Sequence, residues 1–347
     1  MNILALTPYP TEGPSARYRI YALEPGLARR GVALDIRPFM TPAMFVRWMH
    51  TKRLDLPMLL ALARRGLSRL GDLWRAPRYD AVWVHRQTAP ALHGLFDRLL
   101  MRRARRIVFD MDDAVFMEYP IDLLLRGSAG ATVGNGYLAA YVGVRSPHTE
   151  VRIVPTVIDP EVYTPAPTPV SGPLVVGWIG TGASYRNYLA RPLPGLIDTC
   201  RRHGAVFRVI ASPDVQAEVE ALGGQFVAWS LEGFVQELQQ LQIGVMPLHD
   251  DGYARGKCAF KLIEYGAVGL PSVASDLGAN REVIVDGETG WLAGSDEAFA
   301  ARLGDLIADP AARSRMGRAA RQRVLAHYTL EAQAGAVAQL FQHLGGH

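Results

Sequence analysis

The chain has 347 residues, of which 49% are hydrophobic and 20% charged, and its formal net charge at pH 7 is +4. This composition is too apolar for a disordered chain, and the length suits two domains. The positive charge includes no block of like charges, which argues against a nucleic-acid partner and leaves a mild preference for anionic ligands. Cys200 and Cys258 are too few for a disulfide framework in a chain of this length, which fits a reducing compartment.

The first half of the chain alternates short apolar runs with helical patterns. Its opening residues, MNILALTPYP, lack the features of a secretion signal and predict a buried strand, so we expect a cytoplasmic protein. No apolar stretch reaches the roughly 18 residues of a membrane span. The predicted strands are Ile3–Thr7, Ala33–Pro38, Ala81–His85, Ile107–Asp110, Ala131–Val133 and Val151–Pro155.

Five prolines between Val157 and Pro173 predict a linker, because proline ends both helices and strands. The alternation then restarts, with predicted strands in LVVGWIG, VFRVIAS, QFVAW, IGVMPL and PSVAS. Continuous apolar runs between helices indicate parallel strands covered on both faces. The predicted fold is therefore α/β, with two doubly wound, Rossmann-like domains facing across a cleft and closing about the linker.

We place the first domain at residues 1–165 and the second at 166–326. The chain is predicted to be helical from about residue 297, with a break at Asp309-Pro310. A last helix within residues 327–347 is expected to pack back toward the first domain.

Ligands of such sheets bind beyond the carboxyl ends of the strands, so the loops that follow the strands are the places to search. The first loop, TPYPTEGPSARYR, predicts a helix start near Ala16 with Ser15 as its N-cap. Gly13 permits close approach of the backbone to a ligand, and Arg17 is predicted to reach toward a bound anion. A capped turn with solvated arginines is an equal alternative.

The second sheet opens with GWIGTGAS, a glycine-rich turn that includes Gly180 and Thr181. Its spacing differs from the dinucleotide fingerprint G-x-G-x-x-G. The turn is therefore predicted either to bind phosphate or to be glycine-rich for steric reasons alone.

Polar side chains end two strands of the first domain. VFDMDDAVF supplies Asp110, Asp112 and Asp113, and VWVHRQ supplies His85. The carboxylates suit sugar hydroxyls, a divalent metal, a haloacid-type phosphatase or the cap of the next helix. The phosphatase interpretation is disfavoured because Asp-Ala-Val follows where that family has Gly-Thr. His85 suits catalysis or a surface hydrogen bond.

Lysine occurs only three times in the chain, and Lys257 and Lys261 lie close together in RGKCAFKLIEYGAVGLPSVAS. With Glu264 they would share one helical face if a helix began by Lys257. Two adjacent ammonium groups repel unless an anion lies between them, which predicts a diphosphate. Glu264 suits the two hydroxyls of a ribose, and the alternative is a solvated charged face.

This stretch resembles the GT-B glycosyltransferases, in particular retaining enzymes of glycosyltransferase family 4. The similarity lies in Glu264–Asp276 (EYGAVGLPSVASD) and in Glu282–Gly290 (EVIVDGETG), with fainter likeness over nearly the whole chain. The family carries two glutamates separated by seven residues. The second is Glu264, and the first falls at Gly256.

The resemblance implies transfer of a sugar from a nucleotide-diphosphate sugar to a hydroxyl acceptor, with retention, the acceptor in the first domain and the donor in the second. The family's Arg and Lys after the first strand of the second domain are missing, so we assign the phosphate contacts to Arg255, Lys257 and Lys261. The family's histidine has no unambiguous match, and the candidates are His85 and the three aspartates. No metal or further cofactor is expected. A sugar-nucleotide epimerase, a phosphatase and a non-catalytic binding protein are the alternatives.

The segment Met44–Tyr79 mixes Trp48, Trp74 and apolar residues with many arginines. Interfacial helices have this composition, so we expect peripheral contact with an anionic membrane, with ordinary packing of an inserted helical pair as the alternative.

Overall fold

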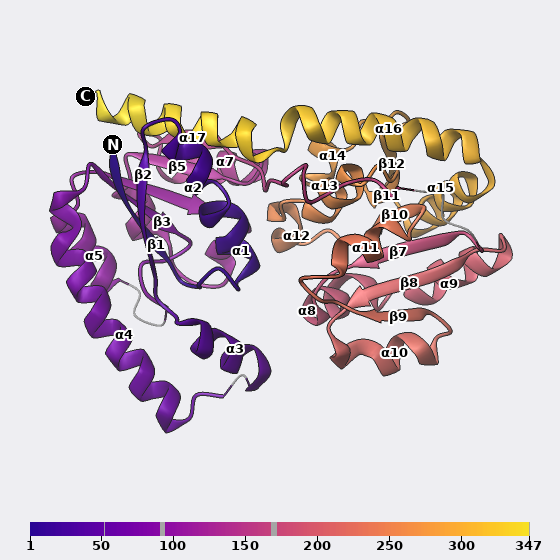
Figure 1. The fold of residues 1–347 in the computed structure, drawn as a ribbon, viewed down its shortest axis with the longest axis horizontal. Coiled ribbons are helices and arrows are strands. Elements are labelled where there is room, and N and C mark those ends of the chain that lie inside the picture. The colour runs from indigo at the N-terminus through magenta and orange to yellow at the C-terminus, as the bar shows by residue number, and fades with distance from the viewer. Residues whose placement is uncertain (52, 91–93, 168–171, 347) are drawn as a thin grey trace. The chain divides into compact units, whose positions relative to one another are not determined.

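The computed structural model describes residues 1–51, 53–90, 94–167 and 172–346 (Figure 1). They form two compact units, each with its own six-stranded parallel sheet. The first unit contains Met1–Val157, Gly256–Cys258 and the chain from Leu330 onward, and the second contains Ile158–Arg255 and Ala259–Thr329. The predicted α/β fold with two doubly wound sheets is confirmed.

The strands of the first sheet are β1 (Asn2–Thr7), β2 (Ala33–Pro38), β3 (Ala81–His85), β4 (Ile107–Met111), β5 (Gly130–Val133) and β6 (Glu150–Ile153). The sheet has the order β2-β1-β3-β4-β5-β6, and β3, β4 and β5, whose sequences are mostly apolar, are buried along their whole length. The strand order reverses between β1 and β3. The loops after these two strands therefore lie next to each other at the carboxyl edge of the sheet, where such folds bind ligands.

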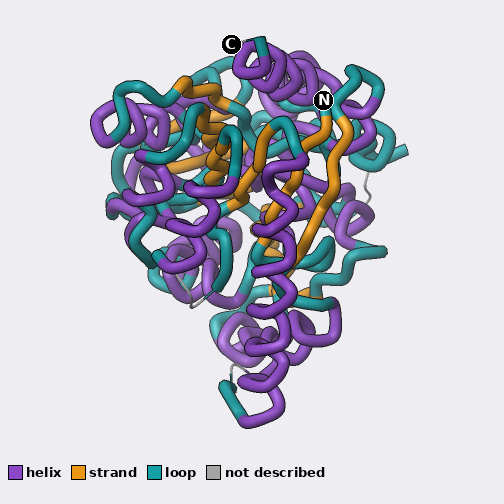
Figure 2. Tube along the Cα trace, turned by 90° about the vertical axis from the view of Figure 1, so that its left-hand side faces the viewer, coloured by secondary structure: helices purple, strands orange, loops and turns teal. Residues whose placement is uncertain are grey.

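Helices cover this sheet, and Figure 2 shows strands, in orange, with helices in front of them. The helices of the first unit are α1 (Pro14–Ala16), α2 (Glu24–Ala28), α3 (Pro42–Thr51), α4 (Leu56–Arg75), α5 (Leu95–Arg103), α6 (Asp122–Arg126), α7 (Gly136–Arg145) and α17 (Leu330–Gly345). The last of these belongs to the core of the first unit, where Phe341 meets Trp83 of β3 edge-on with ring centroids 5.5 Å apart.

The strands of the second sheet are β7 (Val175–Ile179), β8 (Val206–Ala211), β9 (Gln225–Ala228), β10 (Ile243–Met246), β11 (Ser272–Ser275) and β12 (Gly290–Ala293). Their order is β12-β11-β10-β7-β8-β9, so the order reverses between β7 and β10. The sequence did not predict β12, because it is a four-residue edge strand within the glycine-rich EVIVDGETGWLAG segment.

The helices between residues 182 and 327 are α8 (Gly182–Ser184), α9 (Leu193–Arg202), α10 (Gln216–Ala221), α11 (Phe234–Gln239), α12 (Gly252–Gly256), α13 (Phe260–Ala267), α14 (Asn280–Val283), α15 (Asp296–Ala308) and α16 (Pro310–His327). The predicted break at Asp309-Pro310 is confirmed, since Asp309 caps α16 by accepting a hydrogen bond from Ala312 N at 2.9 Å. Among the described residues, no helix combines the length and the apolar character needed to cross a membrane.

The division between the units differs from the boundary expected at residue 165. The first segment of the first unit ends at Val157, because Ile158 N donates to Tyr328 O at 2.9 Å and Ile158 forms a bridge with Thr329, both in the second unit. Part of the predicted proline-rich linker, residues 168–171, lies outside the described residues.

Candidate functional site

Asp110, at the carboxyl end of β4, is a buried carboxylate whose two oxygens are both bound by protein. Oδ1 accepts from Arg19 Nη2 at 2.5 Å and from Thr132 Oγ1 at 2.6 Å. Oδ2 accepts from Arg19 Nε at 3.3 Å and lies 2.6 Å from His85 Nδ1. Burial raises the pKa of Asp110, but Arg19 and the hydrogen bond from His85 outweigh it and hold the pKa below its ordinary value. An ionised Asp110 only accepts, so Nδ1 of His85 carries a hydrogen.

The other ring nitrogen of His85 faces Ser15. His85 Nε2 lies 2.8 Å from Ser15 Oγ, and Ser15 Oγ donates to Asp112 Oδ2 at 2.5 Å. The single hydroxyl hydrogen of Ser15 is thus directed to Asp112, and Ser15 bridges the histidine and the aspartate. His85 is fully buried, and in this arrangement it links the loop after β1 to β4.

The predicted start of the first helix needs correction. Gly13, not Ser15, is the N-cap, and α1 begins at Pro14. Ser15 therefore lies inside the helix, which leaves its side chain available to the network with His85 and Asp112.

Arg86 joins the two neighbouring carboxylates that follow β4. Its Nε donates to Asp112 Oδ1 at 2.7 Å and its Nη2 donates to Asp113 Oδ2 at 2.8 Å. Arg86 has φ +62°, in the left-handed region that side chains other than glycine rarely adopt, and such strain gathers at functional sites. We did not predict Arg86 as a site residue, although its place directly after β3 at the reversal of strand order was the available signal.

Asp112 and Asp113 differ in their affinity for a proton. The pKa of Asp112 is held far below its ordinary value, because Arg86 and His85 outweigh the effect of burial. The pKa of Asp113 is raised by burial and by the neighbouring charge of Asp112, against the opposing effect of Arg86 and Lys257. Asp113 is also the more exposed of the two. Of this pair, Asp113 is therefore the one suited to accept a proton.

These contacts do not fit the phosphatase alternative. A haloacid-type nucleophile needs a free carboxylate oxygen, and Asp110 has both of its oxygens bound to Arg19, Thr132 and His85. In the neighbouring pair, the guanidinium of Arg86 binds one oxygen of Asp112 and one oxygen of Asp113. Across the described part of the chain, no group of three His, Cys, Asp or Glu side chains is placed to hold a metal ion.

The short segment Gly256–Cys258 belongs to the first unit. Asn135 Nδ2 donates to the carbonyl oxygens of Gly256 and Lys257, each at 3.0 Å. A Cβ at position 256 would lie 2.6 Å from Ala114 Cβ and 2.9 Å from Ala114 N. The position of the absent family glutamate therefore has no room for a side chain.

The predicted charged face of Lys257, Lys261 and Glu264 is wrong for Lys257. Helix α13 begins at Phe260, after Ala259 has adopted φ +52°, so only Lys261 and Glu264 are helical. Lys257 belongs to the first unit, where its charge acts on Asp113, whereas Lys261 belongs to the second.

Lys261 lies at the glycine-rich turn that follows β7. Its Nζ donates to Ser184 Oγ at 3.5 Å and lies 5.0 Å from the ring centroid of Trp178. A Cβ at Gly180 would come within 2.4 Å of the Trp178 ring and 3.0 Å of Lys261 Cε, so only glycine fits beneath these side chains. Thr181 caps α8 by accepting from Ser184 N at 3.1 Å. The predicted turn and the predicted lysine thus meet where the strand order reverses between β7 and β10.

Glu264, one turn further along α13, is buried. Its Oε1 accepts a hydrogen bond from the hydroxyl of Tyr163 at 3.0 Å. Tyr163 is buried as well and meets Phe234 at a ring-centroid distance of 5.6 Å. We did not predict Tyr163, because nothing in its local sequence places it beside a residue 101 positions away.

Residues 175–309 match the family described as Glycosyl transferases group 1. The second unit carries a group 1 glycosyltransferase domain. The chain is 33% identical over 106 residues to a glycogen synthase of Mycobacterium tuberculosis and 36% identical over 110 residues to the lipopolysaccharide core biosynthesis mannosyltransferase LpcC of Rhizobium leguminosarum. These matches cover 30% and 31% of this chain, but only 24% and 30% of the relatives' own lengths.

The fold extends beyond that domain. Over 99% of this chain and the whole of the other, the structure of Anabaena HepE in complex with UDP-glucose superposes with a TM-score of 0.72 at 14% sequence identity. At that identity the likeness establishes the fold, and it agrees with the GT-B resemblance.

The remaining predicted binding residues have other partners in the structure. Arg255 Nε pairs with Asp250 Oδ1 at 2.6 Å on an exposed surface. A Cβ at Gly13 would lie 2.6 Å from Tyr9 Cβ, so close packing already requires glycine there. Arg17 is half-buried, with its guanidinium carbon 5.3 Å from the ring centroid of Tyr18. Their predicted contacts with a ligand stay predictions.

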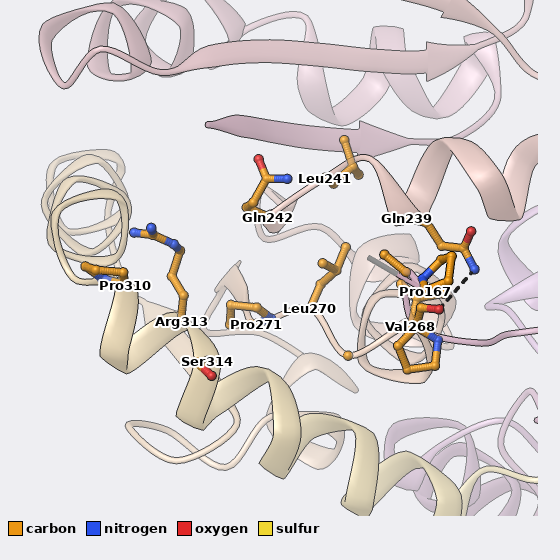
Figure 3. Close-up of a pocket in the computed structure, with 13 residues that line it drawn as sticks. Pro167, Gln239, Leu241, Gln242, Val268, Leu270, Pro271, Pro310, Arg313 and Ser314 are labelled. Carbon is orange, nitrogen blue, oxygen red and sulfur yellow. Dashed lines mark hydrogen bonds between the residues drawn. The ribbon is translucent and has the colours of Figure 1, made fainter. Parts of the chain in front are cut away.

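The glycosyltransferase domain also has a pocket of about 530 Å³ (Figure 3). Leu241 and Gln242 directly precede β10 and Leu270 and Pro271 directly precede β11, so the pocket lies at the amino edge of the sheet. The glycine-rich turn and Lys261 lie at the carboxyl edge. Because ligands of such sheets bind at the carboxyl edge, we do not assign the donor site to this pocket.

Proposed function

We propose that the protein transfers a glycosyl group from a nucleotide-diphosphate sugar to a hydroxyl acceptor. The observation that carries the proposal is the pairing, in a group 1 glycosyltransferase domain, of the Gly180 turn with Lys261 and Glu264 on one helix. The substrate class follows from their chemistry, since an ammonium suits phosphate and a buried carboxylate suits ribose hydroxyls.

The donor diphosphate is proposed to lie against Lys261 and the first turn of α13. Free backbone amides at a helix N-terminus attract phosphate, and the ammonium adds a charge-assisted contact. Negative charge grows on the diphosphate as the glycosidic bond breaks, and fixed cations stabilise this change. Anabaena HepE, which shares the fold, was solved in complex with UDP-glucose, and UDP-sugars are therefore the first donors to test.

The acceptor is proposed to bind the first unit near Asp113. The raised pKa of Asp113 and the cationic neighbours Arg86 and Lys257 suit a carboxylate that binds and deprotonates a sugar hydroxyl. We assign His85, Asp110 and Asp112 to positioning this group. Transfer is proposed to proceed with retention and without a metal ion, with arginine, lysine and backbone amides in contact with the diphosphate.

We place the protein in the cytoplasm, in contact with the inner face of the membrane through segment 44–79. Lys52 of this segment lies outside the described residues. No nucleic-acid partner is proposed. A glycan, a lipid-linked saccharide or a small molecule would each supply the acceptor hydroxyl.

The proposal is tested by titrating the protein with UDP, GDP and ADP and with their sugars, by calorimetry and thermal shift. One nucleotide diphosphate should bind and raise the melting temperature. Failure of every nucleotide to bind would refute the donor site. A sugar-nucleotide epimerase would convert the bound donor without any acceptor, whereas a glycosyltransferase would consume it only when an acceptor is added.

A further inference from the structure

Helix α4 turns Arg65 and Arg69 toward its own unit. Arg65 donates from Nε to Phe39 O and from Nη2 to Pro38 O, both at 2.6 Å. Arg69, which is buried, donates to Arg37 O at 2.9 Å and pairs with Asp72 at 3.2 Å. Hydrogen bonds to backbone carbonyls, rather than apolar packing alone, thus anchor this helix.

The opposite face of α4 is apolar and exposed. Leu56, Leu60, Leu67 and Trp74 are 68%, 58%, 70% and 64% exposed, and their spacing of four, seven and seven residues places them on one stripe. Between residues 46 and 74 lie eight of the nineteen large hydrophobic side chains that are exposed in the described structure. In Figure 1, α4 packs along α5 at the outside of the first unit. This helix therefore exposes an apolar stripe, while it buries Arg69 and Asp72 together with Met58 and Leu73.

Positive charge borders the apolar stripe. Arg53, Arg64 and Arg75 are exposed beside it, and the guanidinium of Arg103 from α5 lies 4.2 Å from the ring centroid of Trp74. The nearby carboxylate, Asp55, caps α4 and pairs with Arg47. An apolar stripe with a tryptophan and an arginine border matches the boundary between acyl chains and anionic headgroups.

We propose that α4 lies in the interface of an anionic lipid bilayer, with Leu56, Leu60, Leu67 and Trp74 among the acyl chains. The inference rests on the peripheral contact proposed for segment 44–79 and specifies the helix, the inserted side chains and the lipid charge. A second copy of this chain is a poorer occupant, because a two-fold contact through the stripe would place its arginine borders near each other.

The test is flotation with vesicles of phosphatidylglycerol and phosphatidylcholine in equal amounts, at low salt. The protein should float with these vesicles and not with phosphatidylcholine alone. The variant carrying both Leu60→Gln and Leu67→Gln should bind at least about tenfold more weakly, because two apolar side chains are lost from the acyl region. Val144→Gln on α7 is the matched control, since Val144 is 78% exposed, and it should bind like the parent.

The inference is overturned if the parent does not float with the anionic vesicles, or if the double variant floats as well as the parent. It is also overturned if the parent forms a dimer that the double variant abolishes, while neither binds vesicles. Binding of a nucleotide diphosphate is measured by calorimetry in parallel. If only vesicle binding is lost, the membrane inference fails while the proposed glycosyl transfer is unaffected.

Discussion

Replacing Lys261 with methionine tests whether its ammonium binds the donor diphosphate. The apolar part of the side chain, which packs over Gly180, is largely kept, and the charge near Ser184 and Trp178 is removed. A charge-assisted contact to phosphate is worth about 1.5–3 kcal/mol, so the dissociation constant for a nucleotide diphosphate should rise roughly 10- to 150-fold. The nucleoside should bind as it does to the parent.

The structure also limits what the substitution does to folding. Lys261 is half-buried, and its contact with Trp178 contributes about 0.5–1 kcal/mol, so the variant should remain folded. Calorimetric titration with the diphosphate and the nucleoside measures the difference. The matched variant is Lys257→Met, which removes a charge that belongs to the first unit and should weaken binding of the diphosphate less. If Lys261→Met binds the diphosphate as tightly as the parent, the assignment of Lys261 is wrong.

Further results are expected for the ribose contact, the packing at Gly256, the acid dependence of stability and the metal requirement. Glu264→Gln should weaken binding of the nucleoside and of the nucleotide diphosphate equally. Tyr163→Phe removes one hydrogen bond to Glu264 and should weaken binding of both ligands by about 1 kcal/mol, measured by calorimetry. Loss of binding confined to the diphosphate would contradict the ribose role. Gly256→Glu should lower the free energy of unfolding, measured by urea denaturation, by at least about 1–3 kcal/mol. The control Gly143→Glu, at a position with open space around it, should show no comparable loss. Unchanged stability of Gly256→Glu would refute the steric explanation. The pKa of Asp112 in the folded protein is lowered, so its contribution to stability is present at pH values above the ordinary pKa of 3.8 and is lost as the pH falls. Asp112→Asn should therefore make the free energy of unfolding less dependent on pH, measured by urea denaturation from pH 7 to below 3. Turnover should survive EDTA, and complete loss restored by magnesium would support a metal.

The sheets could be predicted because each strand is a short apolar run bounded by turns, and residue order alone carries that pattern. The carboxyl-edge rule directed attention to the loops after the strands, and the structure brings the Gly180 turn and Lys261 together within one unit. The edge strand β12 was missed, because four residues with two partly exposed side chains show little pattern.

Features that depend on distant residues could not be predicted. The start of α13 depends on Ala259 adopting φ +52°, which no side chain in the sequence signals, and this turn removes Lys257 from the predicted face. The role of Ser15 depends on contacts with His85, at the end of β3, and with Asp112, directly after β4. The same holds for Tyr163 and Glu264, because their pairing arises only once the second sheet has folded.

The central claim is glycosyl transfer, and the most direct measurement follows the nucleotide diphosphate released from the donor identified by titration. The purified protein is incubated with that donor, alone and with a panel of glycan, lipid-linked and small-molecule acceptors, and both the nucleotide and the acceptor are quantified by mass spectrometry. The account predicts release that depends on one acceptor, with one sugar added to that acceptor for each nucleotide diphosphate formed. Conversion of the donor to an epimer without acceptor, or tight binding with no turnover on any acceptor, would contradict it.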